Sequence, residues 1–202
     1  MSHPYDLEDA NEPYVKYEML NGVMYGEPPY EISGGKKIIM SPAPNYHHGS
    51  IVMLLGKIFL DYIIENNINA TVLGDNFDVY LSKEFHYRPD ISVICDLERV
   101  RNGKRLYDAP DLVVEVLSKA TKKRDTGEKK DRYEESGVRE YWIVDPNNKS
   151  VKVYHLVEGK FEDNGDYYLD GSGSGDKIKV SIFEDLTVEL KMIFRFQILL
   201  GE

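Results

Sequence analysis

Residues Pro110-Asp111-Leu112-Val113-Val114-Glu115-Val116-Leu117 decide the fold, because they set an acidic side chain inside an apolar run of strand length. Alternate residues of a strand point to the same face of a sheet, so Glu115 would share a face with Asp111. A buried glutamate is costly unless a cation or a strong hydrogen-bond donor meets it. Glu115 is therefore either half of a salt bridge, with Arg88 or Lys129 as partner, or part of a functional site.

Other apolar stretches of strand length surround this run, at residues 70–73, 77–81, 91–95, 140–144 and 151–156. An amphipathic helix is predicted from the N-cap residue Asn45 to about Glu65. A charged helix is predicted over residues 122–136 and ends at Gly137, a natural residue for a helix C-terminus. This order of strands and helices predicts a mixed α/β or α+β domain, with a central sheet covered by helices.

Length and composition favour one domain. The chain has 202 residues, of which we assign 1–14 to an N-terminal arm and 15–202 to a single domain. Its 25 basic and 35 acidic residues give a net charge of −10, which argues against an all-over basic nucleic-acid coat and against binding to an anionic membrane. With one cysteine, Cys95, it has no disulfide framework and no thiolate-rich zinc site. We find neither a signal-peptide pattern nor a run of about 18 apolar residues, and expect a cytoplasmic protein without a membrane partner.

Two further stretches carry groups suited to chemistry. Asp90 follows Pro89 at the start of a predicted strand, where by itself it is more simply a turn residue. Residues 119–132 contain seven basic and three acidic side chains, a local charge of +4. Asp125, Lys129 and Tyr133 are spaced four residues apart and would share one helix face, although most such charged helices are solvated surfaces.

Taken together, these groups predict a site for a divalent cation and a phosphodiester. Two carboxylates from neighbouring strands, with waters and substrate oxygens, are typical ligands of Mg²⁺. A nearby lysine can orient a metal-activated water or stabilise the charge that develops on the phosphate. Glycoside hydrolysis by two carboxyl groups is a less favoured alternative, because it has no need of the lysine.

The motifs YEMLNG (17–22), SPAPNYHH (41–48), RPDISVI (88–94), APDLVVEVLSKAT (109–121), RDTGEKKDRYEESGVREYWIVDP (124–146) and VKVYHL (151–156) resemble the Uma-type family of restriction-endonuclease-like proteins, within the PD-(D/E)XK nuclease superfamily. The resemblance runs from about Tyr17 to Phe194. It implies a restriction-endonuclease-like central mixed sheet flanked by helices, and metal-dependent endonuclease cleavage of DNA.

Carried over position by position, the resemblance makes Asp90 and Glu115 the catalytic acids that bind Mg²⁺ or Mn²⁺. Leu117 stands where the superfamily motif has its lysine. Lys129 matches a lysine on the following helix that takes its place in this family, and Lys130 ranks second.

Four more residues follow from the same resemblance. His48 matches a histidine at the start of the first helix that could reach the metal or the phosphate, or could simply bond to the backbone. Glu18 is preferred over Glu27 as the N-terminal acid that many superfamily members supply. Asp125 and Tyr133 would orient Lys129 and Glu115.

Two readings of function remain open. The first is a metal-dependent hydrolase that acts on DNA. The second is a non-catalytic nucleic-acid-binding or scaffold protein on a nuclease fold, which Leu117 and the acidic surface favour. The apolar C-terminal tail, residues 190–200, also predicts a partner surface, with a homodimer as the commonest form.

Overall fold

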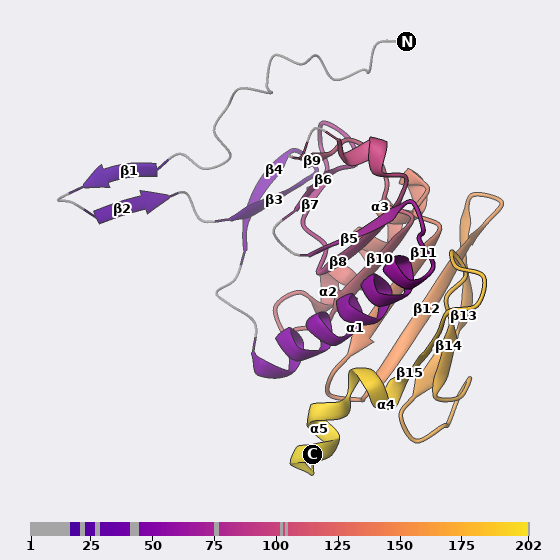
Figure 1. Cartoon of the computed structure of the whole chain (residues 1–202). Helices are drawn as coiled ribbons and strands as arrows, with labels where there is room; N and C mark the ends of the chain where they lie inside the picture. Colours follow the sequence, from indigo (N-terminus) through magenta and orange to yellow (C-terminus); the bar gives the residue numbers. More distant parts are fainter. Residues whose placement is uncertain are drawn as a thin grey trace.

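The computed structural model describes residues 17–20, 23–26, 29–40, 45–74, 77–101, 103 and 105–201, excluding the side chains of 17–20 and 23–26. Figure 1 shows a large sheet with one long helix across it, a smaller sheet beside it and short helices at the C-terminus. This is the predicted α+β class with a central mixed sheet flanked by helices.

The large sheet has six strands in the order β13-β12-β11-β10-β8-β5. They are β5 (Ala70–Gly74), β8 (Ile91–Cys95), β10 (Leu112–Val116), β11 (Glu140–Asp145), β12 (Ser150–Val157) and β13 (Lys160–Tyr168). β10 and β11 pair in parallel and the other neighbours are antiparallel, so the sheet is mixed. β10 lies in the interior of the sheet, which is why its five residues are all buried.

The small sheet has the order β4-β3-β7-β6-β9. Its strands are β3 (Tyr30–Ser33), β4 (Lys36–Ile39), β6 (Asp78–Tyr80), β7 (His86–Tyr87) and β9 (Arg105–Leu106). Two strand pairs stand apart from both sheets, β1 (Tyr17–Leu20) with β2 (Val23–Gly26) and β14 (Lys177–Lys179) with β15 (Thr187–Glu189). The chain passes from β7 directly into β8, so residues 88–90 join the two sheets.

Helix α1 (Tyr46–Glu65) covers one face of the large sheet. Asn45 caps it as predicted, because its side chain accepts a hydrogen bond from the His48 backbone N–H at 3.1 Å. Ile51, Leu55 and Phe59 are fully buried and join the core cluster that includes β10. By length and composition α1 could span a membrane, but this buried face makes it a core helix of the fold.

The charged segment is two helices where the sequence predicts one. α2 (Lys122–Asp125) ends at Thr126, and α3 (Glu128–Ser136) begins after Gly127 and ends at Gly137 in the left-handed conformation. The prediction of one helix was wrong. The break could not be read from the sequence, because Gly127 is the only residue of the segment that disfavours a helix, and a single glycine is a weak signal. α3 packs on the second face of β10, where Tyr133 joins Val113 and Leu117 in a second core cluster.

The C-terminal tail forms α4 (Leu190–Ile193) and α5 (Arg195–Leu200), and between β8 and β9 lies the short 3-10 helix η2 (Leu97–Val100). Part of the tail is packed into the fold, so only some of its residues are available for the partner surface that the sequence predicts. Leu190, Ile193 and Phe194 are buried in the core. The exposed apolar residues of the tail are Met192, Phe196, Ile198, Leu199 and Leu200.

Candidate active site

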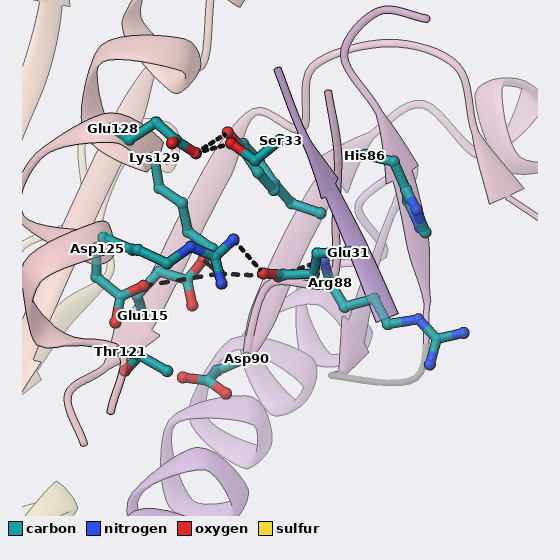
Figure 2. Close-up of polar contacts among 12 residues, drawn as sticks. Glu31, Ser33, His86, Arg88, Asp90, Glu115, Thr121, Asp125, Glu128 and Lys129 are labelled. Carbon is teal, nitrogen blue, oxygen red and sulfur yellow. Dashed lines mark hydrogen bonds and ion pairs between the residues drawn. The ribbon is translucent and has the colours of Figure 1, made fainter. Parts of the chain in front are cut away.

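Lys129 is the centre of a buried ionic cluster between α3, β10 and β3 (Figure 2). Its Nζ atom lies 2.9 Å from Glu115 Oε1, 3.0 Å from Glu31 Oε1 and 3.6 Å from Asp125 Oδ1. Lys129 is 3% exposed, so this single ammonium group faces three carboxylates with almost no access to water. Such a group stays charged only because of its partners.

Glu115 reaches this cluster from the middle of β10, on the face that strand alternation predicts. Its Oε1 atom accepts hydrogen bonds from Lys129 Nζ at 2.9 Å and from the Tyr133 hydroxyl at 2.7 Å. Of the two basic partners considered from the sequence, Lys129 is the one that pairs with it. Arg88 donates instead to Asp78 Oδ1, at 2.6 Å.

Asp90 lies beside Glu115 because the strands that carry them are neighbours. Its Oδ2 atom accepts a hydrogen bond from the Val116 backbone N–H at 2.7 Å, across the gap between β8 and β10. The same oxygen is 3.1 Å from His48 Nε2, at the start of α1. The structure therefore brings together Asp90, Glu115 and His48, three residues singled out from the sequence.

Glu31, on β3, is the acidic residue that sequence reasoning missed. Its carboxylate contacts Lys129 and also pairs with Arg124 NH2 at 2.6 Å. It accepts a further hydrogen bond from the Arg88 backbone N–H at 3.1 Å. Of the acids considered from the sequence, Glu18 is on β1, whose side chains lie outside the described part of the structure, and Glu27 is not among the described residues.

The remaining predicted residues divide into two groups. Asp125 and Tyr133 belong to the cluster, since Asp125 is 1% exposed beside Lys129 and Tyr133 donates to Glu115. The break between α2 and α3 separates Asp125 from Lys129 and Tyr133, but all three side chains still point toward Glu115, as the predicted shared helix face requires. Lys130 points elsewhere, with its Nζ atom 4.9 Å from the centre of the Tyr154 ring.

The charges of the cluster do not balance locally. Burial acts to raise the pKa of Glu31, but the charges of Lys129 and Arg124 outweigh it and hold that pKa below its usual range. Burial raises the pKa of Glu115 well above its usual range, and the charges of Asp125, Asp90 and Glu31 add to the rise against the opposing effect of Lys129. The site therefore has an excess of negative charge around Glu115.

The pKa of Asp125 is also raised, first by burial, which outweighs the lowering effect of Lys129. Its Oδ1 atom is buried and accepts no hydrogen bond. Burial acts to lower the pKa of Lys129, but Glu115, Glu31 and Asp125 raise it, so this lysine stays protonated. A second cation close to these carboxylates would offset the excess of negative charge.

The carboxylates that are present fit Mg²⁺ or Mn²⁺ in their chemistry. Both ions prefer oxygen ligands, and Mg²⁺ takes one or two carboxylates and completes its shell with waters and substrate phosphates. Within the described residues, no three His, Cys, Asp or Glu side chains form a preformed metal cage. Asp90 and Glu115 therefore suit an open site of two carboxylates rather than a closed one.

Two other acids of the motif regions have structural surroundings. Asp111 pairs with Arg99 at 2.8 Å and with Arg139 at 3.3 Å, at the start of β10 and away from the cluster. Asp145 accepts hydrogen bonds from the backbone N–H groups of the turn that follows β11. Asp111 is therefore a residue at the start of a strand, and Asp145 is a turn residue.

Comparisons with known proteins agree with the resemblance seen in the sequence. The model of the family Uma2, described as "Putative restriction endonuclease", matches residues 12–189. An uncharacterized protein of Synechocystis sp. (strain PCC 6803) is 24% identical over 182 residues, which cover 89% of this chain and 84% of that protein. The crystal structure of a putative nuclease belonging to DUF820 from Anabaena variabilis matches with a TM-score of 0.66 and 20% identity, over 84% of this chain and 92% of the other. At that identity, the structural match shows a shared fold.

Proposed function

The chain belongs to the Uma2 family, and from this membership we propose that it is a metal-dependent endonuclease that hydrolyses phosphodiester bonds in DNA. The observation that carries the proposal is the buried pair of Lys129 Nζ and Glu115 Oε1, 2.9 Å apart, beside the Asp90 carboxylate. An ammonium group next to two carboxylates is a set of groups suited to phosphodiester hydrolysis with a divalent cation.

Each residue has a defined role in this proposal. Asp90 and Glu115 would hold Mg²⁺ or Mn²⁺, and the bound ion supplies an activated water and neutralises charge on the phosphate oxygens. Lys129 would orient the attacking water and stabilise the developing negative charge. His48 fixes the Asp90 carboxylate from the start of α1, and Tyr133 fixes that of Glu115.

Further residues keep Lys129 in place. Glu31 and Asp125 face its ammonium group from two other elements, so the lysine has little freedom to leave the site. Leu117, at the position of the superfamily lysine, is buried in the apolar cluster under α3. In this fold the ammonium group therefore comes from α3 instead of β10.

Plasmid cleavage with Mg²⁺ or Mn²⁺ tests the proposal. We expect Asp90→Asn and Glu115→Gln to lose about 10²-fold or more in rate, since each removes charge that acts on the transition state. Asp111→Asn is the matched control, because this carboxylate on the same strand lies away from the cluster, and it should keep the rate. Cleavage that survives in Asp90→Asn would refute the assignment.

A non-catalytic nucleic-acid-binding or scaffold protein is the alternative, and the buried Leu117 at the motif position favours it. Titration of Mn²⁺ into the metal-free protein separates the two without a known substrate. The endonuclease proposal expects saturable binding that Asp90→Asn abolishes. If folded wild-type protein binds no Mn²⁺ with or without DNA, the alternative holds.

We also propose a cytoplasmic homodimer that forms through an apolar surface on α1 and α5. Tyr46 and Phe196 join the two helices, with ring centres 6.4 Å apart. The exposed apolar residues nearby are Met53, Leu60 and Ile64 on α1 and Ile198, Leu199 and Leu200 on α5. We expect light scattering to give twice the monomer mass, and Met53→Glu to reduce it to that of a monomer. A wild-type protein that remains a monomer at high concentration would refute the dimer. Cell fractionation tests whether the protein is in the cytoplasm.

A further inference from the structure

The small sheet has an outer face that turns away from the ionic cluster. Strand registers define it, because residues directly opposite each other in an antiparallel pair point to the same side. Tyr30 is opposite Ile39, and His86 is opposite Tyr80. Figure 2 shows the side chains of His86 and Arg88 on the side of the strands opposite the cluster. We name this surface the tyrosine face, and it consists of Tyr30, Lys37, Ile39, Asp78, Tyr80, His86, Arg88, Arg105 and Tyr107.

A row of aromatic rings with cationic side chains beside it crosses the tyrosine face. Lys37 Nζ lies 3.9 Å from the centre of the Tyr30 ring. The Tyr30 ring meets His86 edge-on, with centres 5.9 Å apart, and His86 stacks on Tyr80 at 4.4 Å. Four side chains from four strands thus form one continuous layer.

Arg105 and Tyr107 extend this layer at the β9 side. The Arg105 guanidinium carbon lies 5.3 Å from the Tyr80 ring centre and 6.0 Å from that of Tyr107. The Tyr80 and Tyr107 rings are 5.3 Å apart. A guanidinium plane among aromatic rings offers a further stacking surface of the kind that nucleic-acid bases use.

The tyrosine face is accessible and positively charged. Lys37 is exposed, and Tyr30, Tyr80, Arg105 and Tyr107 are partly exposed. Its charged residues are Lys37, Arg88 and Arg105 against the single carboxylate of Asp78, so three cations minus one anion leave +2. In a protein with a net charge of −10, this local excess favours an anionic ligand that also carries flat apolar groups.

We propose that the tyrosine face binds single-stranded DNA, with bases stacked on the rings and phosphates near Lys37 and Arg105. Aromatic platforms interleaved with cations are how proteins bind single strands with little sequence preference. The inference rests on the proposed function, since it gives the endonuclease a place to hold the strand next to its cleavage site.

The connection between the two sheets brings this platform close to the carboxylates. Asp90 is four positions after His86 in the sequence, and four residue steps span at most about 14 Å. That is about four nucleotides at ~3.4 Å per nucleotide of a stacked strand. Because the tyrosine face and the ionic cluster lie on opposite sides of the small sheet, a bound strand would pass around the edge of this sheet to reach Asp90 (Figure 2).

Fluorescence anisotropy of a labelled oligonucleotide in EDTA tests the inference, because no cleavage occurs without metal. We expect Lys37→Gln and Tyr107→Ala each to raise Kd about tenfold, equal to about 1.4 kcal/mol. Lys36→Gln is the matched control, since it removes an exposed lysine from the same strand on the opposite side, and it should leave Kd unchanged. Circular dichroism checks that each variant is folded, and Lys37→Gln removes only an exposed side chain.

Three outcomes would overturn the inference: no binding by wild type, equal weakening by Lys36→Gln and Lys37→Gln, or equal affinity for an oligonucleotide with abasic sites. Asp90→Asn in the same assay keeps the two proposals apart. We expect it to bind like wild type while failing to cleave. If Lys37→Gln weakens binding but wild type never cleaves DNA, the endonuclease proposal fails and the tyrosine face remains a DNA-binding surface.

Discussion

Glu115 lies near three other carboxylates, Glu31, Asp90 and Asp125, so a negative charge at this position is costly in stability. Burial and these charges raise its pKa, while Lys129 is its close cationic partner. A buried ion pair commonly contributes less to stability than a neutral group of the same shape. Stability alone therefore does not explain a glutamate at this position, which is in line with the metal-binding role proposed for it.

Replacement of this charge should therefore stabilise the protein. We expect Glu115→Gln to raise the free energy of unfolding by about 1 kcal/mol, because Lys129 keeps Glu31 and Asp125 as charged partners while the repulsion among the carboxylates is lost. Urea unfolding measures the change. Asp111→Asn is the matched comparison and should lower the free energy, since Asp111 has Arg99 and Arg139 as partners. A destabilised Glu115→Gln would show that the pair with Lys129 is net favourable.

Asp78 should give the protein an acid-sensitive contribution to stability. Burial acts to raise its pKa, but the hydrogen bonds from His86 and Arg88 lower it below the ordinary value of 3.8. A lowered pKa in the folded state means that the stabilisation is complete above pH 3.8 and is lost as pH falls through the folded value.

We expect Asp78→Asn to cost about 3 kcal/mol at pH 7, because Arg88 and His86 both lose the buried carboxylate with which they pair. As pH falls through the lowered pKa of folded Asp78, which is below 3.8, the unfolding free energies of wild type and variant should converge. Thermal or urea unfolding from neutral to acidic pH measures both. A difference that stays constant with pH would contradict the assignment of this effect to the Asp78 charge.

The contrast between Glu115 and Glu31 shows what a sequence reveals about single residues. Glu115 stands out because four valines and leucines of its own strand predict burial. Glu31 is in the short segment YEIS, which reads as an ordinary strand, and its partner Arg124 is 93 residues away. Its burial arises only when two sheets and a helix meet, so no local pattern could reveal it.

At the level of elements, Gly127 lies at the break between α2 and α3, directly before the helix that carries Lys129. A Cβ atom at this position would lie 3.0 Å from the Lys123 carbonyl oxygen, which is closer than such atoms approach without movement. We expect Gly127→Ala to cost about 1 kcal/mol and to shift α3, with a loss of cleavage rate. Thermal unfolding and rate measurements on the same samples check this.

Gly56→Ala is the control, since a Cβ on this residue of α1 would meet no atom within 4 Å. Alanine is the better helix former, so the variant should be more stable by about 0.5–1 kcal/mol with an unchanged rate. Equal effects of the two substitutions would show that Gly127 has no special role in the packing of α3.

Elements with a strong internal pattern were predicted well. α1 follows from its apolar spacing and its Asn45 cap, and both ends are where the sequence places them. The short strands of the small sheet, such as β7 and β9 with two residues each, carry too little periodicity to be assigned. They exist because neighbouring strands complete their hydrogen bonds, which is information that no short segment holds alone.

For the whole molecule, the balance between a net charge of −10 and a locally cationic face predicts a weak dependence of DNA binding on salt. Each phosphate contact on a single strand contributes about −0.7 to the slope of log K against log salt. Lys37→Gln should therefore reduce the slope by about 0.7, and Lys36→Gln should not change it. Anisotropy titrations at several salt concentrations measure both slopes.

Asp90 owes its position to a backbone N–H group, that of Val116, and not only to a side chain. No substitution other than proline at residue 116 can delete that donor. The pairing of the strands therefore fixes the donor that positions the Asp90 carboxylate. Lys129 and the acids around it are positioned by contacts between side chains, which substitutions can remove. A substitution elsewhere in the cluster can therefore remove the ammonium group or one of the other acids and still leave in place the hydrogen bond that positions Asp90.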